Sequence, residues 1–327
     1  MRIVINGFGR IGRTVLRQIL RLPAGHSIDV VQINDIAALE TCAYLFKYDS
    51  VFGPYPGSVE HTDDSLIVDG REIYFTCAPD ISGFDLSGVD VVLECTGRAD
   101  TRDVASRGLK AGARNVLISG PSAAADVTLV RGANEDQLAS HTIVSNGSCT
   151  TNALAPLLRG IDDAIGIETG HMTTVHCYTG SQPMVDAPRG PLERSRAGGV
   201  SMVPTTTSAT KLLGVVLPQL GGKVSGAAVR VPSISVSAID VTLTLKEPPE
   251  GGVNAQLQKI FQDSPVVGFT NDHVVSTDMR TRPESLVVAL PETLAVGGRQ
   301  VRIFGWYDNE WGFSCRMIDM ARLMAAR

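Results

Sequence analysis

The sequence predicts an α/β protein with two unlike domains: a doubly wound parallel sheet, then an α+β domain with a mainly antiparallel sheet. Three observations predict this arrangement. Up to about residue 145, short β-branched runs alternate with helical patterns, as in parallel strands joined by crossover helices. A glycine-rich turn separates the first such strand from the first helical pattern. From about residue 166, apolar residues alternate over longer stretches, which favours antiparallel strands with one covered face.

The chain has 327 residues, which is more than one core usually holds, so two domains are expected. We assign residues 1–148 to the first domain and residues 149–312 to the second, and we expect a final helix at 313–327 to pack back on the first domain. Strands of the first domain are expected at RIVI, IDVVQIN, VDVVLE, NVLIS and HTIVS, and helices at residues 12–22 and 38–48. The second domain has alternating segments HMTTVHCYT and VRVPSISVSAIDVTLTLKEP, and helices at residues 209–219 and 254–262.

The composition is that of an ordinary folded protein, with 43% hydrophobic and 19% charged residues. The net charge is -5 and no block of Lys and Arg stands out, so we expect no nucleic-acid partner. No apolar run reaches the roughly 18 residues of a transmembrane helix, and the start lacks the order of a signal peptide. We therefore expect no membrane association and a cytoplasmic location.

Six cysteines are scattered along the chain without CxxC pairs or zinc-like spacing to histidine, so no metal site is expected. We expect free thiols, and about five of the six should be small buried side chains. Cys149 is the exception, because its neighbours in SNGSCTTN are almost all hydrogen-bonding groups.

The stretch INGFGRIGR places Gly7, Gly9 and Gly12 between the strand RIVI and a helical pattern. This spacing is typical of a Rossmann-type nucleotide-binding domain: the first glycine makes the turn, the second admits a pyrophosphate, and the third lets helix and strand pack closely. The second strand leads into Asp35, which suits the ribose hydroxyls of adenosine and would repel a 2′-phosphate. The sequence therefore predicts NAD, not NADP, as cofactor.

Cys149 follows Ser148, a suitable N-cap, and precedes the apolar helical run ALAPLL. A helix start stabilises a thiolate, so we expect the pKa of Cys149 to fall toward neutrality. A nucleophilic thiol usually needs an imidazole nearby. His176 is preferred because it lies near the end of a strand, but spacing alone leaves His171 open; the odd separation points the two histidines to opposite sheet faces. Cys177 should then face away and pack.

Five separated motifs, INGFGRIGR, SNGSCTTN, TTVHCYT, VRVP and WYDNEWGFS, together resemble phosphorylating glyceraldehyde-3-phosphate dehydrogenases over essentially the whole chain. The resemblance implies that Cys149 attacks a phosphorylated aldehyde and that His176 is the base. Hydride passes to NAD, and inorganic phosphate releases an acyl phosphate, 1,3-bisphosphoglycerate. It also implies a homotetramer, with residues 187–203 as a loop near a neighbouring subunit.

The resemblance further implies two sets of binding residues. Groups around the substrate phosphate and the attacking phosphate are Ser148, Thr150, Thr179, Arg194, Thr207, Ser208 and Arg230. Groups around the cofactor are Gly7, Phe8, Gly9, Arg10, Ile11, Gly12, Asp35, Thr96, Gly97, Ser119 and Asn309.

Several positions depart from the family pattern. Ser208 replaces a usual glycine, and the turn FGPYPG replaces a histidine-glycine-basic turn, so either could reshape a phosphate pocket or a subunit contact. Two alternatives remain. An erythrose-4-phosphate dehydrogenase would hydrolyse its thioester with water, but retention of Thr179 and of the segment TTTS argues against it. A non-catalytic NAD-binding scaffold would be expected to have lost the cysteine, the histidine or the phosphate positions.

Overall fold

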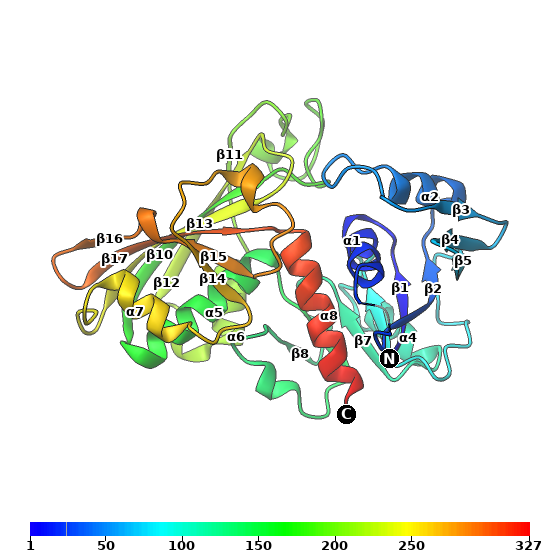
Figure 1. The fold of residues 1–327 in the computed structure, drawn as a ribbon, viewed down its shortest axis with the longest axis horizontal. Helices are drawn as coiled ribbons and strands as arrows, with labels where there is room; N and C mark the ends of the chain where they lie inside the picture. The colour runs from blue at the N-terminus through cyan, green and yellow to red at the C-terminus, as the bar shows by residue number, and fades with distance from the viewer. Residues whose placement is uncertain (24) are drawn as a thin grey trace. The chain divides into compact units, whose positions relative to one another are not determined.

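The computed structural model describes residues 1–23 and 25–327, which divide into two compact units. Unit 1 comprises residues 1–129, 136–147 and 314–327, and unit 2 comprises residues 130–135 and 148–313. Each unit contains one large sheet (Figure 1).

The sheet of unit 1 has the strand order β3-β4-β5-β2-β1-β6-β7-β9-β8. All of its pairings are parallel except those of β4 with β3 and β5. Its strands are β1 (Arg2–Asn6), β2 (Asp29–Asn34), β3 (Val59–His61), β4 (Ser65–Val68), β5 (Arg71–Thr76), β6 (Val91–Glu94), β7 (Asn115–Ile118), β8 (Val127–Thr128) and β9 (Ile143–Ser145). Its helices are α1 (Arg10–Leu20), α2 (Leu39–Lys47), α3 (Arg102–Ala105) and α4 (Arg107–Lys110). The chain winds outward from β1 in both directions, so the carboxyl ends of β1, β2 and β6 flank the switch point where open α/β sheets bind ligands.

The sheet of unit 2 is mainly antiparallel, in the order β11-β12-β10-β13-β17-β15-β14, with β16 paired to β17. Its strands are β10 (Ile167–Cys177), β11 (Val203–Thr205), β12 (Val224–Val231), β13 (Ser237–Leu245), β14 (Val267–Thr270), β15 (Leu286–Ala289), β16 (Leu294–Val296) and β17 (Gln300–Tyr307). Its helices are α5 (Cys149–Ala164), α6 (Ala209–Val216) and α7 (Val253–Ile260); α8 (Trp311–Ala325) starts in unit 2 and runs into unit 1. Two of its pairings are parallel, that of β12 with β10 and that of β14 with β15, so the sheet is mixed as well as mainly antiparallel.

The core of unit 2 explains why α5 begins where it does. Leu154, Leu157 and Leu158 are fully buried in a cluster that includes Met172 of β10 and Ile239 of β13. Burying one such side chain contributes roughly 1.5–3 kcal/mol, so the apolar face of α5 is fixed against the sheet. This packing fixes the position of the helix start.

Two aspartates hold the FGPYPG turn of unit 1. Asp49 Oδ1 accepts from Phe52 N at 3.0 Å at the start of the turn. Asp69, in the left-handed region at φ 50°, accepts hydrogen bonds from Tyr55 Oη at 2.8 Å and from Ser58 N at 2.9 Å. The turn also reaches the glycine-rich segment, because Arg10 lies over the Phe52 ring at 5.4 Å. It therefore supports the start of α1.

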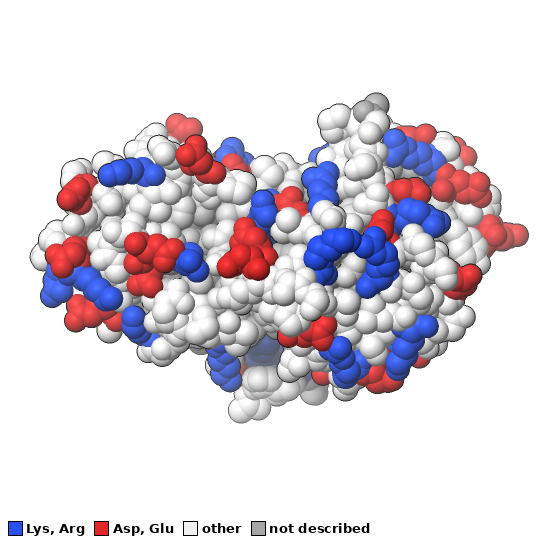
Figure 2. Space-filling model, turned by 90° about the horizontal axis from the view of Figure 1, so that it is seen from below, with Lys and Arg blue, Asp and Glu red and all other residues white. Residues whose placement is uncertain are grey.

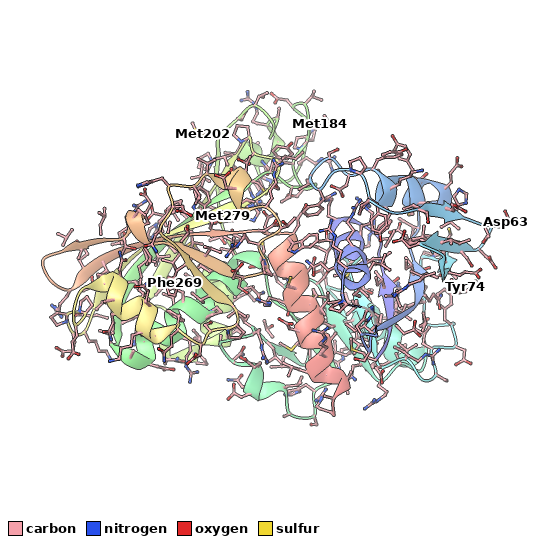
Figure 3. The ribbon with its side chains drawn as sticks, viewed as in Figure 1. Asp63, Tyr74, Met184, Met202, Phe269 and Met279 are labelled. Carbon is pink, nitrogen blue, oxygen red and sulfur yellow. The ribbon has the colours of Figure 1, made fainter. Side chains whose placement is uncertain are left out.

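We expect Asp69→Ala to lower the free energy of unfolding by about 2 kcal/mol, because it removes both hydrogen bonds to the turn. Asp63 is the matched control: it is exposed in the turn between β3 and β4 (Figure 3), and Asp63→Ala should change stability by less than about 0.5 kcal/mol. Urea unfolding of both variants measures the difference; equal midpoints would contradict the assigned role of Asp69.

Candidate functional site

The three glycines after β1 are required for different reasons. Gly7 has φ 96°, and a Cβ there would lie 2.6 Å from the backbone of Cys95 and Thr96. A Cβ on Gly12 would lie 2.2 Å from Gly7 O. A Cβ on Gly9, by contrast, meets nothing within 4 Å, so the space beside the N-cap of α1 is open. Two glycines pack the loop and the middle one leaves room for a ligand, as pyrophosphate binding requires.

Asp35, directly after β2, ties this loop to the sheet. Its Oδ2 accepts from Phe8 N at 2.6 Å and its Oδ1 accepts from Ala37 N at 2.9 Å. Arg10 points instead to Asp49, with Nη1 to Oδ2 at 2.6 Å, and Ile11 lies between Arg10 and Gly12 in the first turn of α1. The loop is therefore preformed.

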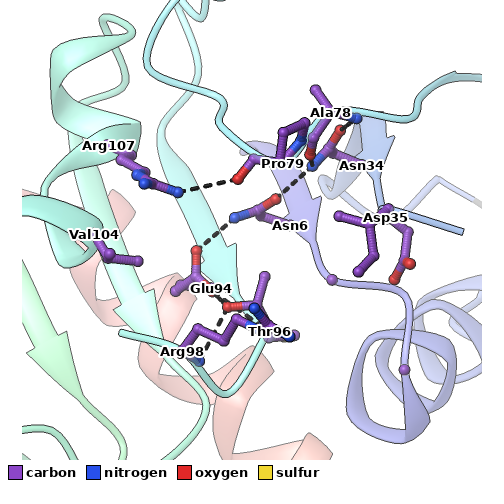
Figure 4. A pocket seen from close by; sticks show the side chains of 14 residues that line it. Asn6, Asn34, Asp35, Ala78, Pro79, Glu94, Thr96, Arg98, Val104 and Arg107 are labelled. Atoms are coloured by element: carbon purple, nitrogen blue, oxygen red, sulfur yellow. Dashed lines mark hydrogen bonds between the residues drawn. The ribbon is translucent and has the colours of Figure 1, made fainter. Parts of the chain in front are cut away.

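A pocket opens at the carboxyl ends of β1, β2 and β6 (Figure 4). Of the predicted cofactor residues, it is lined by Gly7, Gly9, Asp35 and Thr96. Gly97, at φ 69°, follows Thr96, and Ser119 N donates to Glu94 O at 2.9 Å behind the pocket. Sequence reasoning missed the remaining lining residues: Asn6, Asn34, Ile36, Ala78, Pro79, Glu94, Cys95, Arg98, Val104 and Arg107. This pocket, with the open space beside Gly9 and the carboxylate of Asp35, fits the dinucleotide that the sequence predicts.

The second group of predicted residues gathers at the start of α5 in unit 2. Ser148 is the N-cap, and its Oγ accepts from Thr151 N at 3.0 Å, so Cys149 is the first helical residue. Cys149 Sγ lies 3.4 Å from His176 Nε2 on β10. His171 is exposed on the same strand and contacts Ser225 Oγ at 2.8 Å. The structure thus brings His176, and not His171, to the cysteine.

The prediction that the pKa of Cys149 falls is wrong. Burial raises the pKa of the thiol, while the Arg230 guanidinium opposes that rise. Burial and, next, the Arg230 guanidinium together lower the pKa of His176 to about 4. The helix start is present, but desolvation outweighs it, so a neutral thiol faces a neutral imidazole.

Arg230 lies beside this pair because β12 runs parallel to β10 with Arg230 opposite His176. Its Nη1 is 2.6 Å from His176 Nδ1 and donates to Cys177 O at 3.0 Å; Nδ1 itself is 2.7 Å from that carbonyl. When Nδ1 donates to the carbonyl, Nε2 keeps its lone pair toward the sulfur. A guanidinium has only donors, so its approach to Nδ1 disfavours this proton and makes the imidazole a weaker base.

A directed chain of hydroxyl groups lies behind the cysteine. Thr174 Oγ1 donates to Ala238 O at 3.0 Å, so it accepts from Tyr307 Oη at 2.8 Å. Tyr307 in turn accepts from Thr150 Oγ1 at 2.9 Å. Thr150, predicted to contact phosphate, therefore offers a ligand its backbone and its oxygen lone pairs, because its hydroxyl proton is already used.

The other predicted anion-binding residues lie on neighbouring segments. Arg194 Nε donates to Thr205 Oγ1 at 2.9 Å, which ties residues 192–195 to β11, and β11 pairs with β12 at Arg230. Thr207 Oγ1 accepts from Ala209 N at 3.1 Å, and Ser208 occupies the N-cap position of α6 without a side-chain cap. Thr179 Oγ1 contacts Ser181 Oγ at 2.9 Å.

Asn309, predicted to hold the cofactor, is fixed by two side chains of unit 2. Cys177 Sγ donates to its Oδ1 at 3.2 Å, and Ser237 Oγ donates to the same oxygen at 3.3 Å. Ser237 follows Val236, a buried β-branched residue at φ 67°. Strain of this kind persists only where surrounding contacts enforce it, and here it places Ser237 against Asn309. Cys177 is buried, as expected, but also positions an amide.

Other surface and cysteine features bear on the expectations. Cys42 and Cys177 are buried, Cys77 is exposed, and the other three cysteines are partly buried, so the expectation that about five are buried is wrong. Among the described residues, no cluster of three or more possible metal ligands occurs, and no helix is both long and apolar enough to cross a membrane. On the face that Figure 2 shows, acidic and basic side chains are interspersed.

Comparisons with known proteins cover both units. Residues 1–102 match the family described as "Glyceraldehyde 3-phosphate dehydrogenase, NAD binding domain", and residues 148–309 match the corresponding C-terminal domain. Glyceraldehyde-3-phosphate dehydrogenase of Xanthobacter flavus is 44% identical, covering 99% of this chain and 98% of its own. The enzyme of Pseudomonas aeruginosa is 45% identical, covering 100% and 98%. Glyceraldehyde-3-phosphate dehydrogenase 2 of Bacillus subtilis is 42% identical, covering 100% and 97%. The chain therefore belongs to the glyceraldehyde-3-phosphate dehydrogenase family and is an NAD-binding phosphorylating dehydrogenase of that type.

Proposed function

We propose that this enzyme oxidises glyceraldehyde 3-phosphate, with inorganic phosphate, to the acyl phosphate 1,3-bisphosphoglycerate. Residues 1–148 would form the NAD-binding domain, with the final helix packed back on it, and residues 149–312 would carry the chemistry. The distance of 3.4 Å between Cys149 Sγ and His176 Nε2 is the observation that carries the proposal. A nucleophile and a base in contact, beside a guanidinium, form the arrangement that acyl transfer from a phosphorylated substrate needs.

In the first stage, Cys149 Sγ attacks the aldehyde carbon and a C–S bond forms. His176 Nε2 receives the thiol proton and passes it to the former carbonyl oxygen, which becomes a hydroxyl group. NAD, when bound, supplies the acceptor for the hydride that then leaves this carbon. His176 takes the hydroxyl proton back as the C=O bond reforms, leaving a thioester on Cys149.

In the second stage, a phosphate oxygen attacks the thioester carbon. The C–S bond breaks, the sulfur leaves as a thiolate and takes the proton held by His176, and the acyl phosphate departs. Phosphate loses its own proton to solvent. Arg194, Thr207 and Ser208, on the segments joined to β11, are proposed to hold this phosphate, with Ser148 and Thr150 beside the sulfur.

Arg230 and Thr179 are proposed to hold the substrate's own phosphate. The Arg230 guanidinium lowers the pKa of His176, and a phosphate dianion bound to it would offset that charge. Substrate binding would then raise the pKa of His176 at the step where it must accept a proton. The same residue both anchors the substrate and adjusts the base.

The assembly is proposed to be a homotetramer. The loop between β10 and β11 exposes large apolar side chains, among them Leu192 at 88%. Met184, at 93%, and Met202, at 75%, are labelled in Figure 3. Such a concentration of exposed apolar groups is typical of a surface covered by another chain.

Turnover of glyceraldehyde 3-phosphate tests the proposed substrate. Purified protein given glyceraldehyde 3-phosphate, NAD and phosphate should produce NADH continuously, whereas omission of phosphate should stop turnover at the thioester. Cys149→Ser should lower kcat at least about 10³-fold while NAD still binds. Absorbance at 340 nm measures both. If turnover continues without phosphate and erythrose 4-phosphate is the preferred substrate, the protein would instead be an erythrose-4-phosphate dehydrogenase, which hydrolyses its thioester.

Arg230 should affect the pH at which Cys149 reacts. Because Arg230 lowers the pKa of Cys149, Arg230→Gln should move the pH profile of Cys149 alkylation to higher pH, and Arg230→Lys should retain much of the wild-type profile. Iodoacetamide labelling must be read at the Cys149 peptide by mass spectrometry, because Cys77 is exposed. A Gln variant with an unshifted profile would show that Arg230 does not act on the sulfur.

The exposed Leu192 side chain allows a test of the proposed homotetramer. Leu192→Arg should reduce the particle mass measured by light scattering from four chains to fewer, because a charge would be buried against a neighbour. Tyr74→Arg is the control: Tyr74 is 49% exposed on β5, outside the loop, and this change should leave the mass unaltered. A tetramer that tolerates Leu192→Arg would place the interface elsewhere.

A further inference from the structure

A row of buried polar side chains forms the floor of the nucleotide pocket (Figure 4). Asn6, Asn34 and Glu94 are the last residues of β1, β2 and β6, which are neighbours in the sheet. They are 6%, 2% and 2% exposed. Three polar side chains in one row beneath a pocket need a reason, because burial of polar groups is unfavourable unless every group is paired.

Hydrogen bonds along this row of Asn6, Asn34 and Glu94 connect the Glu94 carboxylate to one wall of the pocket. Asn6 Nδ2 donates to Glu94 Oε2 at 2.5 Å, and Asn34 Nδ2 donates to Asn6 Oδ1 at 2.8 Å. Asn34 then holds Ala78 on both sides: its Oδ1 accepts from Ala78 N at 3.0 Å, and its Nδ2 donates to Ala78 O at 2.9 Å. Ala78 and Pro79 line the pocket.

The second oxygen of Glu94 holds a different wall. Its Oε1 accepts from Thr96 N at 3.0 Å and from the Thr96 hydroxyl group. Thr96 Oγ1 in turn accepts from Arg98 N at 3.2 Å. Thr96 and Arg98 also line the pocket, so one carboxylate is bonded to groups that lead to two separate walls.

The direction of the row is fixed at both ends. A carboxylate only accepts, and the backbone of Ala78 presents one donor and one acceptor, so neither amide can turn over without losing a bond. Burial raises the pKa of Glu94, and the bonds from Thr96 and Asn6 oppose that rise. Both oxygens of Glu94 thus accept from donors that belong to the pocket itself.

We propose that Glu94 is a positioning residue for the adenosine half of NAD, acting through Asn6 and Asn34 on the Ala78–Pro79 wall and directly on the Thr96 turn. Asp35, which suits the ribose hydroxyls, lines the same pocket and indicates which half of the dinucleotide lies there. Arg107 is a separate support, because its Nη1 donates to Pro79 O at 3.0 Å without involving the row. The inference rests on NAD binding by this family and not on the proposed aldehyde.

The test exchanges the donor and the acceptor in the hydrogen bond between positions 6 and 94. In Glu94→Gln, the new amide oxygen can keep the hydrogen bonds from Thr96. The new amide nitrogen then faces Asn6 Nδ2, so two donors meet. In Asn6→Asp, two carboxylates face each other. In the double variant, the new amide at position 94 can donate to the new carboxylate at position 6. That carboxylate still accepts from Asn34, so the row is complete again.

The measurement is binding of ADP-ribose by calorimetry, which involves neither Cys149 nor an aldehyde. Each single variant should bind about tenfold more weakly, as expected for one broken buried hydrogen bond, and the double variant should return to within about threefold of wild type. Hydrogen exchange at the Ala78 amide should speed up in the single variants and recover in the double one. Glu60→Gln, an exposed carboxylate on β3, is the control and should bind as wild type does.

Normal ADP-ribose affinity in Glu94→Gln, or a double variant as weak as the product of the single effects, would overturn the proposal. If a single variant does not fold, the double variant decides alone: near-normal binding supports the row, and weak binding refutes it. In the wild-type protein, absence of aldehyde oxidation together with normal ADP-ribose binding would count against the proposed function and not against this inference.

Discussion

The contact between the Cys149 thiol and the His176 imidazole is the constraint on which the chemistry of unit 2 depends. Burial raises the pKa of Cys149 and lowers that of His176, so both shifts keep the proton on sulfur. Reaction then requires charge to form inside the protein, and only a nearby counter-charge makes this favourable. Arg230 fills that position because the parallel register of β10 and β12 places it opposite His176.

Much of the fold could be predicted because its main elements are periodic. The strands β1, β2, β6, β7 and β9 lie where β-branched runs occur, and α5 begins at Cys149 as the cap and apolar run indicate. The strands β3, β4 and β5 were not predicted, because segments of three to six residues in a turn-rich region carry little periodicity. The parallel pairing of β12 was also missed, because alternation reports a covered face and not the direction of a neighbour.

Some residues of the candidate sites could likewise be predicted from the sequence, and others could not. The cysteine, the histidine and the glycines have local signatures, and the structure places them where those signatures suggest. The pKa of Cys149 was predicted with the wrong sign, because a helix start is read from a few residues whereas desolvation depends on the whole core. Asn6, Asn34 and Glu94 were missed because a single polar residue at a strand end looks like a turn residue; only the adjacency of β1, β2 and β6 makes them a row.

Both units hold buried polar groups in the same way, by ending a chain of hydrogen bonds at the backbone. In unit 2, Thr150, Tyr307 and Thr174 lead to Ala238 O. In unit 1, Glu94, Asn6 and Asn34 lead to Ala78. A backbone group cannot rotate or change its role, so it fixes the direction of every donor along the chain. Side chains at the ligand end are thereby oriented before any ligand arrives, which reduces the ordering that binding would otherwise require.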